Sequence, residues 1–248
     1  MQLLSHAEAA LKRNWRVVFA YIVATVLLVT VYSFVMSWLE LAVPKDTNPK
    51  PFWYVLTTLS ADLIKVVLIT IFQSIAFTLI GSEMDRPLWK CDGWRDGLTR
   101  FFTLWFIINL LYVTSDRLPG SLPEAYQVDT VMTVLLFQLG LTVFAVPFGA
   151  CIMHGGGLHW KDVPQMLAPF FRLFPMSLVA MSLGFMQFFV FAIVIITFSR
   201  ESLESPWLWA VVNIPLILLE CLAFAVMWLA CIQYRDVAPE EDNDDFDF

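Results

Sequence analysis

Ionisable side chains in the middle of long apolar runs are the first residues of this sequence that could do chemistry. Glu220 lies within NIPLILLECLAF (213–224), and Asp62 and Lys65 lie within a second apolar run. If these runs cross a bilayer, the charges are expensive and are expected to be paired or functional. Both runs begin on the same predicted side of the membrane, and Lys65 and Glu220 then lie about thirteen and fourteen residues deep. We therefore expect a Lys65–Glu220 ion pair, with Asp62 as a second acid.

Two other roles for Glu220 stay open. One is a proton or ion relay that also uses Lys65 and Asp62, and the other is a protonated carboxyl group hydrogen-bonded to Asn213 or Gln73. Helical spacing places Gln73 on the side of Asp62 and Lys65, and Asn213 on the side of Glu220. The predicted intramembrane charge cluster is therefore Asp62, Lys65, Gln73, Asn213 and Glu220. Other amides within apolar runs are expected to join helices by hydrogen bonds; they are Asn109, Gln138 and Gln187.

A second candidate for chemistry is the segment CIMHGGGLHW (151–160). Cys151, His154 and His159 carry groups that bind metals, and three glycines could approach a phosphate. Their spacing matches no zinc, haem-attachment or phosphate-loop pattern, so we expect no metal and no cofactor. A glycine turn that ends a helix is the favoured interpretation. No nucleophile lies in a recognisable pattern with a base, and we expect no catalytic residues and no enzyme activity.

The composition indicates the elements that must position these residues. Hydrophobic residues make up 59% of the chain and charged residues 15%, with a mean hydropathy of +0.71. Soluble domains carry about 25% charged residues, so we predict an all-α, polytopic membrane protein. Runs long enough to cross a bilayer predict six transmembrane helices, over 15–39, 53–81, 99–115, 130–153, 174–198 and 207–234.

The distribution of Lys and Arg predicts the orientation of these helices. Ten of the basic residues fall in the two termini and the second and fourth loops, against four in the other three loops. Because basic residues are retained on the cytoplasmic side, we expect both termini in the cytoplasm. The expected location is the bacterial cytoplasmic membrane. The four cysteines fall in the spans or on the cytoplasmic side, so no disulfide framework is expected.

Three stretches of the sequence look alike: 6–23, 93–110 and 159–178. Each has a short amphipathic segment that passes a basic residue and enters an apolar run. This pattern is typical of interfacial elbow helices that feed transmembrane hairpins, which predicts three hairpins. The expected cytoplasmic interfacial residues are Trp94, Arg95, Asp96, Trp160, Lys161 and Asp162.

These elbows, and the ending ACIQYRD with Tyr234, Arg235 and Asp236, resemble bacterial six-span proteins. The group includes YciC-like proteins and the membrane domain attached to some glycerophosphodiester phosphodiesterases. The order of Arg235 and Asp236 departs from that group, and we expect no attached catalytic domain. The resemblance implies an integral membrane role and names no substrate.

The sequence divides into a transmembrane domain (1–238) and an acidic tail (239–248). The dense like charge of the tail predicts a disordered cytoplasmic segment, and Asp244, Asp245, Phe246, Asp247 and Phe248 could dock on a basic groove of a cytosolic partner. The favoured function is a non-catalytic scaffold or accessory subunit that associates with other membrane proteins or with itself in the lipid bilayer. The alternative is a small transporter or lipid-handling protein that uses Lys65, Glu220 and Asp62. We expect no nucleic-acid partner.

Overall fold

The computed structural model describes residues 2–43, 47, 50–85, 91, 93–121, 124–198 and 205–237. Within these ranges the chain is all-α, and six helices are long and apolar enough to cross a membrane. They are α2 (Trp15–Ala42), α3 (Phe52–Met84), α4 (Trp94–Ser121), α5 (Glu124–His154), α8 (Phe174–Thr197) and α10 (Pro206–Val237). The prediction of an all-α polytopic membrane protein is confirmed.

Three short helices precede the spans. Helix α1 (Gln2–Arg13) is amphipathic and ends one residue before α2, and α6 (Val163–Met166) and α7 (Ala168–Arg172) precede α8. These two places hold the elbows expected in the first and third copies of the repeat. In the second copy α4 runs without a break from Trp94, so the amphipathic segment there is the first part of the span itself. The helical pattern of 93–110 has no Pro or Asn to interrupt it before the apolar run, unlike the other two copies.

Helix α10 lies at the centre of the bundle. It packs against α2, α5 and α8, and its C-terminal half also contacts α1 and α7. The stretch Phe224–Trp228 is completely buried, and small residues such as Ala223 and Ala230 let neighbouring helices approach closely. A helix that is apolar on all sides is typical of a buried span, and α10 is the most buried of the six.

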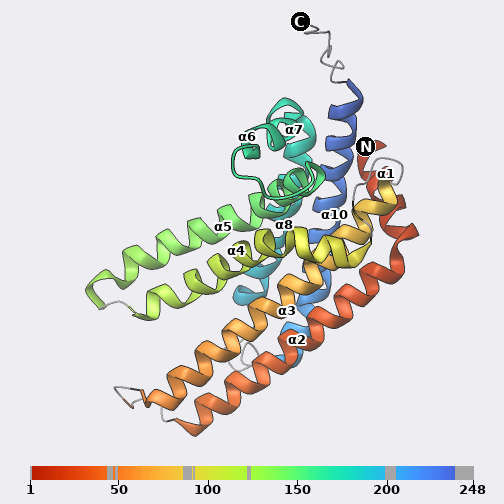
Figure 1. Ribbon diagram of the computed structural model, residues 1–248. Helices are drawn as coiled ribbons and strands as arrows, with labels where there is room; N and C mark the ends of the chain where they lie inside the picture. Colours follow the sequence, from red (N-terminus) through yellow and green to blue (C-terminus); the bar gives the residue numbers. More distant parts are fainter. Residues whose placement is uncertain are drawn as a thin grey trace, which may run out of the picture.

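Consecutive spans pack side by side as α2 with α3, α4 with α5, and α8 with α10 (Figure 1). Helices α1, α6 and α7 lie at the same end of the bundle as the C-terminal end of α10. We call this the α1 end, and the other end the opposite end. The α2–α3 and α4–α5 pairs extend away from α8 and α10 toward the opposite end.

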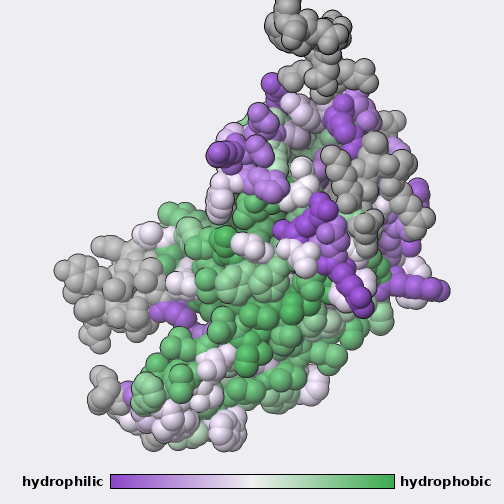
Figure 2. Space-filling view, viewed as in Figure 1, coloured by the Kyte–Doolittle hydropathy of each residue, from purple (hydrophilic) through white to green (hydrophobic). Residues whose placement is uncertain are grey.

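The surface is divided by polarity in the way that a bilayer requires. Figure 2 shows a continuous apolar surface over the long helices and a concentration of hydrophilic side chains at the α1 end. Large apolar side chains such as Leu27, Ile64, Phe189 and Ile196 are exposed along the spans. In water such a surface would be an aggregation hazard, whereas lipid chains cover it without penalty.

Close packing between α5 and α8 depends on Gly184. A Cβ at this position would lie 2.7 Å from both the carbonyl oxygen of Thr142 and the Cα of Val143. These are backbone atoms, so the two helices would have to move apart. We expect Gly184→Ala to lower the free energy of unfolding by about 1–3 kcal/mol, measured by denaturant titration in mixed micelles.

Gly140 provides the matched control, because it lies on α5 and a Cβ there would meet no atom within 4 Å. Gly140→Ala should leave stability unchanged or raise it by about 0.5–1 kcal/mol through helix propensity. Equal losses for the two variants would contradict the close approach of α5 and α8.

Candidate functional site

Glu220 stands in a hydrogen-bond network near the middle of α10. The Gln73 amide donates to Glu220 Oε1 at 2.7 Å, and the Tyr21 hydroxyl donates to Oε2 at 3.1 Å. The Asn109 amide in turn donates to Gln73 Oε1 at 2.6 Å and to the Thr70 hydroxyl at 3.2 Å. This Glu220 network (Tyr21, Thr70, Gln73, Asn109, Glu220) joins α2, α3, α4 and α10.

The predicted Lys65–Glu220 ion pair is wrong. The Lys65 ammonium lies over the Tyr32 ring, 4.3 Å from its centroid, and both Glu220 oxygens face donors from α2 and α3. The residue of α3 that reaches Glu220 is Gln73, which lies about 12 Å further along the helix than Lys65. Counting residues from the start of each run gave similar depths, but α3 and α10 do not begin at the same level in the bundle.

Of the expected amide partners of Glu220, the structure brings Gln73 to it and leaves Asn213 apart. The Asn213 amide donates to the Trp209 carbonyl oxygen of its own helix at 2.7 Å. The carboxyl group therefore depends for its hydrogen bonds on Gln73 and Tyr21 rather than on its own helix. Hydrogen bonds between helices of this kind contribute about 0.6–2 kcal/mol each within a membrane.

Asp62 belongs to a second cluster, about 16 Å from Gln73 along α3. The Arg117 guanidinium binds its carboxylate in a bidentate manner, with two N–O distances of 3.0 Å, and the Tyr32 hydroxyl donates to Oδ1 at 2.5 Å. This Asp62 cluster (Tyr32, Asp62, Arg117) joins α2, α3 and α4 toward the opposite end. Asp62 is buried and Arg117 is partly exposed, so the arginine supplies the charge that was expected from Lys65.

A cavity of about 470 Å³ extends between the two polar groups. Tyr32 of the Asp62 cluster and Asn109 of the Glu220 network both line it, together with Lys65, Asp116 and Asn213. Apolar side chains form most of the remaining wall; they are Val29, Val66, Ile69, Val113, Phe191, Trp209 and Leu216. A second cavity of about 290 Å³ shares Tyr112, Asp116, Phe191 and Leu216 with it. We call the first the Lys65 cavity.

An aromatic layer lies between the Glu220 network and the α1 end. Phe77 stacks on Phe224 with ring centroids 4.4 Å apart, and Trp105 lies 4.9 Å from Phe77. Trp228 follows Phe224 by one helical turn, at 5.4 Å. These four side chains are completely buried. Because Phe77 and Phe224 come one turn after Gln73 and Glu220, the layer closes the bundle directly beyond the network.

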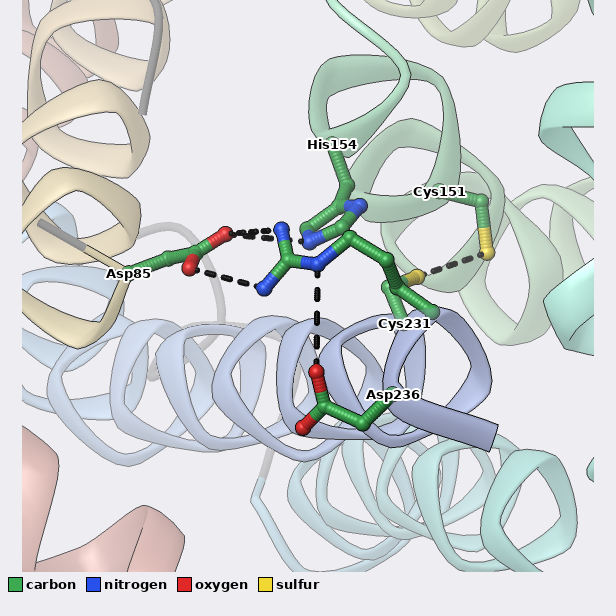
Figure 3. Close-up of polar contacts among 6 residues, drawn as sticks. Asp85, Cys151, His154, Cys231 and Asp236 are labelled. Atoms are coloured by element: carbon green, nitrogen blue, oxygen red, sulfur yellow. Dashed lines mark hydrogen bonds and ion pairs between the residues drawn. The ribbon is translucent and has the colours of Figure 1, made fainter. Parts of the chain in front are cut away.

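A third polar cluster lies at the α1 end, where α3, α5 and α10 finish. The Arg235 guanidinium forms two hydrogen bonds to Asp85, at 2.8 and 3.0 Å, and His154 Nε2 lies 3.3 Å from the same carboxylate (Figure 3). We call Asp85, His154 and Arg235 the Asp85 cluster. Nearby, the Cys151 and Cys231 thiols lie 3.6 Å apart as free cysteines. A cavity of about 400 Å³ borders this cluster.

The segment 151–160 forms the glycine turn that was predicted. Gly156 and Gly157 have φ values of 98° and 138°, which glycine adopts without steric cost, and they release the chain from the end of α5. His154 points to Asp85, whereas His159 is exposed. Within the described parts of the chain, no three His, Cys, Asp or Glu residues lie together as a metal site.

The predicted interfacial residues lie at the α1 end. Trp94 and Trp160 are exposed, and the Arg95 guanidinium lies over the Trp94 ring at 5.3 Å. Asp96 binds Arg100 one turn further along α4, at 2.9 Å. Lys161 and Asp162 are exposed in the turn before α6. The tail residues Asp244, Asp245, Phe246, Asp247 and Phe248 lie outside the described residues.

Several residues of these clusters were not singled out from the sequence. Arg117 was counted as a loop residue, and Tyr21 and Tyr32 carry no charge that would mark them in an apolar run. Asp85 was not named, and its partner Arg235, which was named only in the ending ACIQYRD, is 150 residues away in the chain. One signal was present: Arg117 lies only two residues after the predicted span 99–115, so its long apolar stem can lie along the helices at that end.

The arrangement provides hydrogen-bonding and charged groups inside a largely apolar cavity, which is the composition of a binding site for a small molecule. It provides no nucleophile held against a base among the described residues. No family model matches the chain, and no curated protein or solved structure matches it. The resemblance to YciC-like proteins therefore stays a prediction from the sequence.

Proposed function

We propose that this protein is a small transport or lipid-handling membrane protein whose binding site is the Lys65 cavity. The observation that carries the proposal is the position of this cavity, between the Asp62 cluster and the Glu220 network. Its volume of about 470 Å³ lies in the range of small-molecule sites, about 300–1,000 Å³. Its walls combine apolar side chains with a few polar groups, as such sites do.

The closed α1 end supports this proposal. The buried aromatic layer lies between the Lys65 cavity and that end, and the Asp85 cluster, with its separate cavity, lies beyond the layer. A carrier needs a site that is open on one side and sealed on the other. With both termini in the cytoplasm of a bacterium, as the basic residues predict, the cavity opens toward the outer side. In this proposal the Glu220 network is the floor of the site and holds four helices in register.

The role of scaffold or accessory subunit has less support from geometry. It rests on the tail 239–248, which lies outside the described residues, and on exposed apolar faces that lipid covers equally well. Polar groups that only join helices need no cavity between them, whereas a binding site does. The Lys65 cavity therefore favours binding of a small molecule over a purely structural role.

Accessibility of a cysteine in the cavity tests the proposal. Ser33 lines the cavity, and Ser33→Cys can be made in a Cys91→Ser background, which removes the one partly exposed native thiol among four. We expect a charged, membrane-impermeant thiol reagent to modify Ser33→Cys from the outside of intact cells. Thr78→Cys is the control, because Thr78 is completely buried in the sealed half and should not react.

The background variant without an added cysteine should also stay unmodified, since Cys151, Cys221 and Cys231 are buried. If Ser33→Cys reacts as slowly as Thr78→Cys, the cavity is closed to water and the proposed function fails. Reaction in inverted vesicles only would contradict the proposed orientation.

A further inference from the structure

We infer that the Lys65 cavity binds the anionic group of a single-chain amphiphile, a carboxylate or a phosphate, and that Lys65 is the residue that holds it. This inference rests on the proposed function and names the class of ligand. Its first support is the state of Lys65. No carboxylate oxygen of the described residues lies within ion-pair distance, 4.0 Å, of its ammonium group, and its one close partner is the Tyr32 ring.

The absence of a carboxylate within ion-pair distance matters because of the position of Lys65 in the membrane-spanning helix. Lys65 lies near the middle of α3 and is half-buried. An ammonium group at such a depth is costly unless it has a counter-charge, and a cation–π contact offsets only part of that cost. The carboxylate of Asp62 is already bound by Arg117 and Tyr32. Asp116 and Asp62 act on the Lys65 ammonium group only from beyond ion-pair distance, and an incoming anion would provide a counter-charge in direct contact with it.

A second polar group in the cavity also lacks a partner. Thr25 lines the same cavity and is only 6% exposed, and its hydroxyl has no hydrogen-bond partner among the described residues. Buried hydroxyl groups are nearly always hydrogen-bonded. A ligand oxygen can accept from Thr25 while it neutralises Lys65. Asn109 and Asn213 line the same cavity and are uncharged.

The rest of the wall suits a hydrocarbon chain. Val29, Val66, Ile69 and Leu216 are aliphatic, and Phe191 and Trp209 pack together at 5.6 Å. One carboxylate, Asp116, also lines the cavity, and the Gln138 amide donates to it at 2.5 Å. Asp116 should repel an anion and lower its affinity for the cavity. Removal of the Asp116 charge should therefore have the opposite effect to removal of the Lys65 charge.

The experiment measures protection of Ser33→Cys from the thiol reagent, in the Cys91→Ser background. Four ligands with the same ten-carbon chain are compared: decanoate, decyl phosphate, decanol and decyltrimethylammonium. We expect the two anions to slow modification at concentrations where the alcohol and the cation do not. Protection by only one anion identifies the headgroup as a carboxylate or as a phosphate. Equal protection by all four overturns the inference, because it requires no charge.

Two variants test the residues. Lys65→Met should raise the half-protecting concentration of the anion about tenfold, as expected for the loss of one charge-assisted interaction. Asp116→Asn should lower it, by removal of the like charge. Lys12→Met is the matched control, because Lys12 is a highly exposed lysine paired with Glu8 on α1, and it should have no effect.

The outcomes separate this inference from the proposed function. If Ser33→Cys does not react at all, the proposed function fails. If it reacts but neither anion protects it, the cavity is accessible and only the ligand class is wrong. If Lys65→Met does not insert in the membrane, Asp116→Asn still decides the matter, since unchanged protection in that variant contradicts an anion in the cavity.

Discussion

Replacement of Trp228 by alanine is expected to lower the free energy of unfolding by about 3–5 kcal/mol, the usual loss for a large aromatic side chain in a core. Trp228 is completely buried, and its ring contacts Phe224 and His154. It also lies against Gly81, where a Cβ would come within 2.8 Å of the indole. Because α3 is fitted to the ring at this point, the helices cannot collapse fully into the space that alanine leaves.

Trp207 is the matched control for this variant, because it is a tryptophan of the same helix that is 67% exposed. Trp207→Ala should change stability by less than about 1 kcal/mol. Both variants are measured by denaturant titration in mixed micelles, with the same reporter. Similar losses for the two would contradict the central, buried position of the C-terminal half of α10, and with it the sealed α1 end on which the proposed function depends.

Loss of Arg235 is expected to have the second largest effect. Arg235→Met would leave the buried Asp85 carboxylate without its guanidinium partner, and removal of one member of a buried pair usually lowers stability by about 3–5 kcal/mol. The side chain of Arg235 is 35% exposed, so water screens part of the interaction, and we expect a loss of about 2–3 kcal/mol. Stability falls mainly because the Asp85 carboxylate keeps an uncompensated charge, rather than because its hydrogen bonds to Arg235 are lost.

A double variant can measure how much of the stability loss comes from the uncompensated charge of Asp85. Asp85→Asn removes the charge and keeps an oxygen that can accept a hydrogen bond, so Asp85→Asn with Arg235→Met should recover most of the stability that Arg235→Met loses. The coupling free energy of the pair is obtained from the four proteins in one titration series. Additive losses would contradict the ion pair.

The ion pair of Lys12 and Glu8 is the control for screening of an ion pair by water. Both side chains are highly exposed, and the distance between the charged atoms is 2.7 Å. Lys12→Met should lower stability by no more than about 0.5 kcal/mol. The contrast between two ion pairs of nearly equal length would show that burial of the carboxylate, rather than distance, sets the cost at Asp85.

The positions of the six spans could be predicted from the sequence because hydropathy is a local property. A run such as 174–198 has to cover about 30 Å of hydrocarbon with its own backbone bonds satisfied, and only a helix does both. The structure places α8 at Phe174–Thr197, close to that range. The short helices before α2 and α8 were also expected from a local signal, the amphipathic segments in 6–23 and 159–178.

The residues that carry polar chemistry were also visible in the sequence, because a charge or amide in an apolar run is conspicuous. Asp62, Lys65, Gln73 and Glu220 all take part in the clusters or line the cavity between them. Their partners could not be predicted in the same way. A partner depends on how far each helix is rotated about its axis, how it is tilted, and at which level it begins.

Those three quantities are set by packing between helices. Gly184 determines how closely α8 approaches α5, and the Phe77–Phe224 stack fixes the level of α3 against α10. With that level fixed, Gln73 reaches Glu220, and Lys65 lies in a cavity where no carboxylate of the described residues is within ion-pair distance of it. The sequence by itself therefore determined that the chain lies in a membrane and which side chains are unusual there. Only the tertiary structure decided which of them meet, because their contacts join residues as far apart as Tyr21 and Glu220.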